Sequence, residues 1–137
     1  MAWLELIGRL LFVAMFLMSG VTHFAKREDY VAYARMKGAP APGLLVPFTG
    51  LMLLAGGALI GIGVWADLGA LLIAAFLVPT AYFMHNFWTV EDPQARMNEQ
   101  AHFMKNMTMA GAALVMLFFF QQCSGHVGLT AGPVSLF

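Results

Sequence analysis

Long apolar runs separated by short polar connections dominate the pattern of this chain. A helix that crosses a bilayer needs about 20 mostly apolar residues. Segments of this kind predict four spans, over residues 3–25, 43–65, 68–88 and 101–120. Because the bilayer core offers no water to backbone polar groups, such spans must be helical. The fold class that we expect is therefore all-α, a transmembrane four-helix bundle.

The connections predict further structure within a single membrane domain covering residues 1–137. Residues 27–37 mix apolar and charged positions, which is typical of a short amphipathic helix lying at the membrane interface. The tight turn before the third span favours Asp67 as the N-cap of that helix. Residues 123–137 are glycine-rich, and we expect them to form an irregular tail at the surface.

Glycine and proline mark two places inside the spans. Gly57 and Gly61 form a GxxxG pair, which lets a second helix approach closely, either within the monomer or across a dimer. Pro79 lies in the middle of the third span, where it removes a backbone hydrogen bond and frees the carbonyl of Ala75. The resulting kink serves either ordinary helix packing or a cavity below His85.

Composition supports the membrane assignment. Hydrophobic residues make up 61% of the chain and charged residues only 10%, whereas soluble domains usually carry about a quarter charged residues. The lipid bilayer is therefore the expected partner. The net charge is zero and basic runs are absent, so we expect no nucleic acid binding. The single cysteine, Cys123, excludes an intrachain disulfide.

The charges also indicate an orientation. Basic residues concentrate in connections 26–42 and 89–100, which four spans place on one side of the membrane. The positive-inside rule predicts that these connections are cytoplasmic and that both termini lie outside.

The first apolar segment is not preceded by basic residues, as a signal peptide would be, so we interpret it as a retained membrane helix. Within it, Glu5 and Arg9 lie four residues apart, which suits an ion pair, a role inside the bundle, or a contact with a partner protein.

Polar and aromatic side chains gather where the third span ends and the fourth begins. The predicted topology brings them to the same membrane face as the end of the first span. On the third helix, Tyr82 is expected to share a face with the two polar residues that follow it at i+3 and i+4. The candidate ligand-binding residues are His23, Tyr82, His85, Asn86, Trp88, His102, Lys105 and Asn106.

Several chemistries can be weighed for this set. Imidazoles bind zinc, copper or iron, but closely spaced metal ligands and nearby acidic residues within the spans are absent, so we predict no metal site. Haem ligation would need histidines deeper in the bundle. A quinone or another lipid-like molecule fits better, because its polar head can hydrogen-bond near the interface while its tail lies between apolar helices. The alternative is a purely structural role, in which these groups cap and clasp the helix ends.

The chain resembles the DoxX-like family of small four-helix membrane proteins. The resemblance lies in GRLLFVAMFLMSGVTHF, YARMKGAPAP, the glycine-rich second span, FMHNFW and HFMKNMTMAGAAL. It implies a bacterial or archaeal cytoplasmic membrane and a link to membrane redox chemistry, since the family is named for a subunit of a quinone-reducing thiosulfate oxidoreductase. It supplies no agreed catalytic residues. The shared motif positions are His85, Asn86, Trp88, Lys105 and Asn106.

These observations favour an accessory subunit of a membrane redox complex that holds a quinone-like molecule. The alternatives are a structural or assembly subunit without a ligand, and an oligomeric carrier of a lipid-like substrate. A self-sufficient redox enzyme is disfavoured because the sequence has no cysteine pair and no flavin fingerprint. We therefore assign no catalytic residues, and quinone is the one cofactor under consideration. The expected protein partners are other membrane subunits or further copies of the chain.

Overall fold

The computed structural model describes residues 2–137, and in that range the chain folds into helices joined by short connections. Four of the helices are long and apolar enough to cross a membrane, which confirms the prediction of an all-α four-helix bundle. The α-helices are α1 (Ala2–Ala25), α2 (Arg27–Met36), α3 (Pro42–Ile62), α4 (Ala66–Met84) and α5 (Pro93–Gln122). Two short 3-10 turns, η1 (Phe87–Thr89) and η2 (Ser124–His126), follow α4 and α5.

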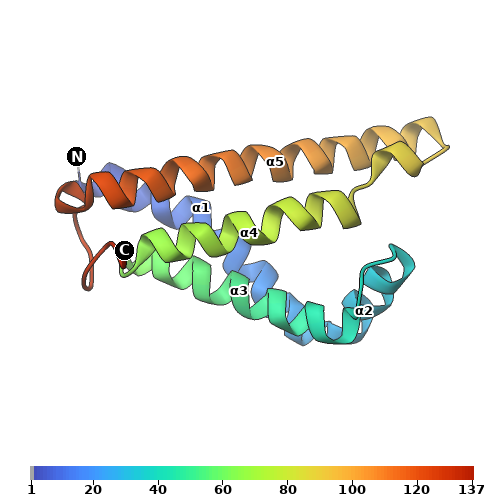
Figure 1. Cartoon of the computed structure of the whole chain (residues 1–137), viewed down its shortest axis with the longest axis horizontal. Helices are drawn as coiled ribbons and strands as arrows, with labels where there is room; N and C mark the ends of the chain where they lie inside the picture. Colours follow the sequence, from blue (N-terminus) through green and yellow to red (C-terminus); the bar gives the residue numbers. More distant parts are fainter. Residues whose placement is uncertain (1) are drawn as a thin grey trace.

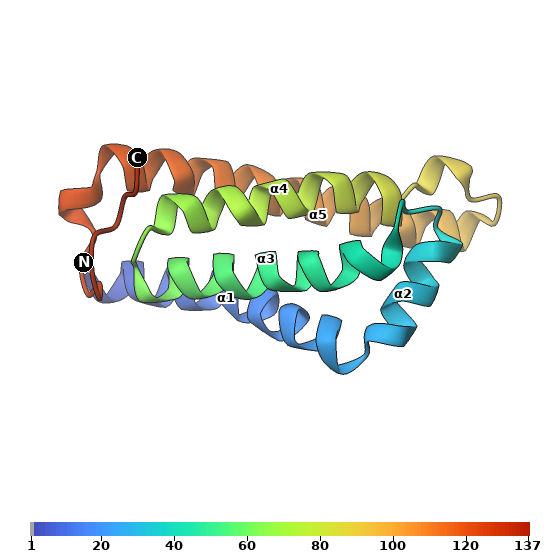
Figure 2. The same ribbon diagram turned by 60° about the horizontal axis from the view of Figure 1, so that its bottom comes forward.

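The long helices pack in a chain of neighbours. Helix α1 packs against α3, α3 against α4, and α4 against α5 (Figure 1). The short helix α2 turns away from α1 at one end of the bundle, the same end at which α5 begins (Figure 2). The start of α1 and the C-terminus lie at the opposite end (Figures 1 and 2).

Apolar side chains form the interior and also cover much of the outside. Phe16, Leu53 and Ile73 are almost completely buried where the helices meet. Other apolar side chains, such as Leu11 and Val115, point outward and are largely exposed. An outer surface of this kind is stable in contact with lipid rather than water.

Close helix contacts depend on glycine at several positions. A Cβ atom added to Gly50 of α3 would lie 2.7 Å from the Cβ atom of His23 on α1. A Cβ atom added to Gly57 would lie 2.8 Å from a methyl carbon of Leu17, also on α1. The glycines therefore serve packing within the monomer, the first of the two uses expected for Gly57.

Two expectations about helix ends differ from the structure. The N-cap position of α4 is occupied by Trp65, in a left-handed backbone conformation, and not by Asp67, which lies inside the first turn. At the other end, α4 stops at Met84, because His85 has left the helical region with φ −125° and ψ 44°. Tyr82 therefore does not share a continuous helical face with His85 and Asn86. The expected span over residues 68–88 lies within Ala66–Thr89, a segment long and apolar enough to cross a membrane, although its α-helix ends at Met84.

Helix α5 begins well before its apolar part. Asp92 caps it by accepting a hydrogen bond from Ala95 N at 2.8 Å, and Pro93 occupies the first turn. The expected span over residues 101–120 is the apolar portion of this longer helix. The extra turns carry Glu99 to the level of α2, where it takes part in the cluster described below.

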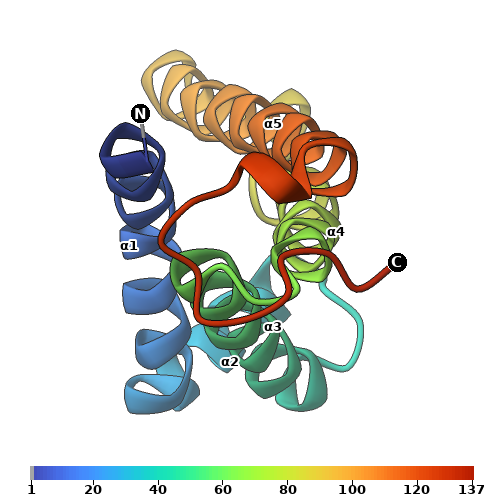
Figure 3. The same ribbon diagram turned by 90° about the vertical axis from the view of Figure 1, so that its left-hand side faces the viewer.

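The segment after η2, which we call the C-terminal strap (residues 127–137), is irregular but firmly attached. It crosses the end of the bundle from α5 past α1 and α3 (Figure 3). Its backbone pairs with the α3–α4 turn: Ala131 N donates to Ile62 O, and Trp65 N donates to Pro133 O at 2.8 Å. Val134 is buried against the core. The tail therefore closes one end of the bundle.

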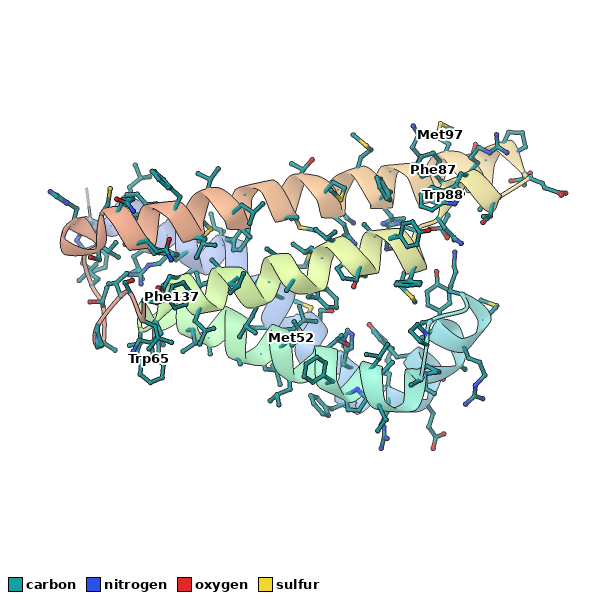
Figure 4. All side chains as sticks on the ribbon, viewed as in Figure 1. Met52, Trp65, Phe87, Trp88, Met97 and Phe137 are labelled. Carbon is teal, nitrogen blue, oxygen red and sulfur yellow. The ribbon has the colours of Figure 1, made fainter. Side chains whose placement is uncertain are left out.

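Hydrogen bonds to Asp67 hold the strap in place. Its carboxylate accepts hydrogen bonds from Leu136 N at 2.9 and 3.0 Å, Ser135 Oγ at 2.9 Å and Phe137 N at 3.3 Å. The carboxylate also accepts a bond from Leu68 N in its own helix. Figure 4 shows Phe137 beside Trp65, at the end of the molecule opposite Phe87 and Trp88.

Candidate functional site

A cavity of about 750 Å³ lies between the helices near α2. All five α-helices contribute to its wall. Apolar side chains such as Phe16, Met52 and Phe76 line its inner part, and Met52 lies midway along the bundle (Figure 4). Its polar lining residues are Ser19, His23, Asp29, Tyr30, Tyr33, Thr49, Thr80, His85, His102, Lys105 and Asn106.

Five charged or titratable residues contact one another beside the cavity, and His85, His102 and Lys105 of this set line it. We call Lys37, Glu99, His85, His102 and Lys105 the histidine cluster. Glu99 lies at its centre: one carboxylate oxygen is 2.8 Å from Lys37 Nζ and the other is 2.8 Å from His85 Nδ1. The cluster therefore joins the segment after α2, the end of α4 and the first turns of α5.

The Lys37–Glu99 contact is a partly buried ion pair. Both side chains are less than one-fifth exposed. Burial favours the neutral amine of Lys37, but the hydrogen bond and charge of Glu99, together with Tyr33, outweigh it and hold the pKa of Lys37 above its ordinary value. The lysine is therefore charged at neutral pH, and it neutralises the carboxylate that His85 contacts.

The two histidines of the cluster lie face to face. Their ring centres are 5.1 Å apart and the planes differ by 21°. On the far side of the pair, Lys105 Nζ lies 3.3 Å from His102 Nδ1. The two residues are three apart in α5, a spacing that places their side chains on one face of the helix. Both imidazoles line the cavity.

His23 lies on another wall of the cavity and is 7% exposed. Its Nδ1 is 2.7 Å from Ser19 O, one turn earlier on α1. The ring packs 4.7 Å from that of Tyr30 and 6.1 Å from that of Phe76, measured between ring centres. His23 is thus held by its own helix and by aromatic neighbours, apart from the histidine cluster.

Three of the predicted site residues lie elsewhere. Tyr82, Asn86 and Trp88 do not line the cavity. Asn86 precedes η1, and the rings of Tyr82 and Trp88 pack 5.5 Å apart. Trp88 also packs against Phe103 of α5. The structure therefore separates an aromatic contact between α4 and α5 from the five predicted residues that do line the cavity: His23, His85, His102, Lys105 and Asn106.

Sequence reasoning missed the residue at the centre of the cluster. Glu99 belongs to the charged connection, so it was not counted among the groups near the spans. Its position carried a signal, because Glu99, His102 and Asn106 are spaced i, i+3 and i+7 along α5 and so share a helical face. Lys37 had no local signal, since its contact with Glu99 spans 62 positions.

Glu5 and Arg9 lie at the opposite end of the bundle and form no part of the cavity. Arg9 is 2% exposed, and its Nε is 2.8 Å from a Glu5 oxygen. The approach is that of an ion contact rather than a well-directed hydrogen bond. One terminal nitrogen of Arg9 donates to Gly128 O and Leu129 O, both at 3.0 Å. Arg9 therefore holds the C-terminal strap.

The cavity offers both apolar contact and hydrogen bonds. A pocket with an apolar wall and a few convergent polar groups is the usual form of a small-molecule site. Lys105 and His102 supply donors, and the buried amide of Asn106 supplies both a donor and an acceptor. Such a lining can bind an amphiphilic molecule with a polar head and an apolar remainder.

Comparison with known proteins identifies the family of this chain. No curated protein and no solved structure gives a significant match to it. A protein-family model described as DoxX matches residues 4–86, which cover α1 to α4 and more than half of the chain. The matched region includes His23, Lys37 and His85, whereas Glu99, His102 and Lys105 follow it. This multi-pass membrane protein belongs to the DoxX family.

Proposed function

We propose that this DoxX-family protein holds a quinone-like or lipid-like amphiphile in the cavity, as an accessory subunit of a membrane redox complex. The observation that supports the proposal best is a single cavity that combines an apolar inner wall with three members of the histidine cluster, His85, His102 and Lys105. The polar head would lie at His85, His102 and Lys105. The apolar part would extend toward Met52.

The dimensions suit such a molecule. The lining residues of α1 extend from Met15 to His23, and eight residues of helix correspond to about 12 Å. That length accommodates a ring or headgroup together with the beginning of an apolar chain. We propose further that the α2 end faces the cytoplasm of a bacterial or archaeal cell, as the basic connections indicate.

The role of an accessory subunit rests on two features of the chain. Resemblance to the family implies a link with membrane redox chemistry, while the sequence has no cysteine pair or flavin fingerprint of its own. Broad exposed apolar faces on α1, α3 and α5 leave surface for lipid or for neighbouring subunits. The function is then to hold a molecule for a partner.

A second candidate, a structural subunit without a ligand, is favoured by a different observation. The Lys37–Glu99–His85 contacts hold the helices together at one end of the bundle, and the C-terminal strap does so at the other end. In this interpretation the histidine cluster is a clasp between α2, α4 and α5. The two candidates differ in whether a small molecule accompanies the purified protein.

The test is purification from the native membrane in a gentle detergent, followed by native mass spectrometry and identification of extracted small molecules. We expect a stoichiometric amphiphile and co-isolated redox subunits. A His85→Ala, Lys105→Ala double variant should lose most of the amphiphile. The matched control is His126→Ala, Lys26→Ala, which changes exposed residues of the same types outside the cavity.

Each outcome decides between the candidates. Redox partners without an amphiphile would favour the structural subunit. Equal amounts of amphiphile in the double variant and its control would remove the histidine cluster from the proposal. A homo-oligomer without other subunits would contradict both candidates and favour a carrier of a lipid-like substrate.

A further inference from the structure

The contacts of His85 define which of its nitrogens donates. Nδ1 lies 2.8 Å from a Glu99 oxygen, and an ionised carboxylate can only accept hydrogen bonds. Nδ1 therefore carries a hydrogen. In a neutral imidazole the other nitrogen is then an acceptor. Neutral His85 thus offers Nε2 as an acceptor, and within residues 2–137 that nitrogen has no hydrogen-bond partner.

His102 has the opposite arrangement. Its Nδ1 lies 3.3 Å from Lys105 Nζ, and an ammonium group can only donate. Nδ1 must accept in this contact, so the hydrogen of neutral His102 resides on Nε2. Across the described part of the chain, that nitrogen also has no partner. Two stacked rings that both line the cavity therefore present one acceptor and one donor.

We propose that the site selects polar heads that carry a hydroxyl group, such as a hydroquinone or another phenol, over heads that carry only carbonyl or ether oxygens. This inference rests on the proposed function and names its ligand class. A hydroxyl can donate to His85 Nε2 and accept from His102 Nε2. A carbonyl or an ether can accept from His102 but leaves the acceptor of His85 unpaired.

Glu99 is then a positioning residue that acts through His85. Each of its two carboxylate oxygens has a different partner, because one accepts a hydrogen bond from Lys37 and the other accepts one from His85. In a Glu99→Gln variant, the amide oxygen remains the only acceptor for Lys37. The amide NH₂ group then faces His85 Nδ1, which must accept. The hydrogen of His85 moves to Nε2, and both rings become donors toward the cavity.

The first test measures the tautomers directly. Nitrogen NMR of isotope-labelled protein in micelles, at slightly alkaline pH, distinguishes protonated from unprotonated ring nitrogens, with His85→Gln and His102→Gln for assignment. We expect the hydrogen on Nδ1 of His85 and on Nε2 of His102. Glu99→Gln should move the hydrogen of His85 to Nε2, while Glu91→Gln, an exposed glutamate of the same connection, should leave it in place. A wild-type His85 with its hydrogen on Nε2, or on both nitrogens, would overturn the inference.

The second test measures ligand preference in nanodiscs with two probes, an alkyl-tailed hydroquinone and its dimethyl ether. The wild type and Glu91→Gln should bind the hydroquinone about 10-fold more tightly, because the ether leaves a polar group unpaired. Glu99→Gln should reduce this preference to about 2-fold or less. Equal binding of both probes by the wild type would overturn the inference and leave the amphiphile site intact. Binding of neither probe would overturn the proposed function as well.

If Glu99→Gln fails to fold, a second variant, Lys105→Met, tests the proposal through His102. Lys105 is exposed, and Lys105→Met removes the ammonium group that fixes His102. Both tautomers of His102 should then appear in the NMR spectrum, and the preference for hydroquinone should fall about 3-fold or more. An unchanged tautomer and an unchanged preference in this variant would contradict the assignment of His102.

Discussion

Lys37 Nζ lies 2.8 Å from Glu99 Oε1, and this ion pair connects the end of α2 to α5 across 62 positions of the chain. Lysine follows a short amphipathic helix, whereas glutamate lies two turns into the longest helix. The pair fixes α2 over the cavity, to whose wall α2 contributes Tyr30 and Tyr33. The position of α2 therefore depends on a contact that local sequence does not specify.

Loss of this pair should loosen α2 rather than unfold the bundle. A Lys37→Met, Glu99→Gln double-mutant cycle should give a coupling energy of about 1 kcal/mol, since both side chains are partly shielded from solvent. Spin labels on α2 and α5 should show a broader distance distribution in Lys37→Met. Lys26→Met, which changes an exposed lysine outside this contact, is the control. An unchanged distance distribution would mean that α2 is held by its other contacts.

Arg9 should be among the most sensitive positions in the chain. Arg9→Met removes the partner of the Glu5 carboxylate and leaves the carbonyls of Gly128 and Leu129 without their donor. Because removal of one member of a buried pair leaves an uncompensated charge, the expected loss is about 3 kcal/mol. Thermal unfolding in detergent measures the loss, and proteolysis reports release of the strap.

Arg35→Met provides the matched control for Arg9. Arg35 is exposed on α2, and its substitution should change stability by less than about 0.5 kcal/mol. Equal effects of the two substitutions would show that Arg9 contributes little to the bundle.

Asp67 should anchor the strap through its charge and its acceptors. In Asp67→Asn, an amide NH₂ group would face N–H and O–H donors of Ser135, Leu136 and Phe137. We expect a loss of about 2 kcal/mol, whereas Ser135→Ala should cost about 1 kcal/mol, since one hydrogen bond is lost. Limited proteolysis of residues 127–137 should follow the same order. A larger effect of the serine substitution would contradict this account.

Two glycine substitutions should differ in their effect on stability. Gly50→Ala would bring a Cβ atom within 2.7 Å of His23 Cβ, forcing α1 and α3 apart, so we expect a loss of about 2 kcal/mol. Gly111→Ala, where a Cβ would meet nothing within 4 Å, should be neutral or stabilising by up to about 1 kcal/mol. Melting temperatures of both variants in one detergent give the comparison. Equal shifts would contradict the proposed close packing.

The parts of this structure that could be read from the sequence are those governed by local patterns. Apolar length indicated the four membrane-spanning helices. The shared face of His102 and Lys105 also follows from helical spacing. The break in the helix after Met84 had no such signal, because apolar and aromatic residues continue beyond it into η1.

The contacts between distant segments could not be read in this way. Nothing near Lys37 indicates that it meets Glu99, and nothing near Asp67 indicates that it binds the strap rather than caps its own helix. Such pairings depend on where the helices cross. Glu99 could have been included by its register with His102 and Asn106, which would have added a carboxylate to the predicted site.

The C-terminal strap also gives the molecule an order of assembly. Arg9 is synthesised with the first membrane helix, but its carbonyl partners at Gly128 and Leu129 are made only after the fourth helix. Until then its guanidinium group has only Glu5 and the carbonyl of Ile60 as partners among the contacts that it makes in the folded chain. A chain that stalls before the strap therefore carries a cation within its first membrane helix that lacks two of its carbonyl acceptors.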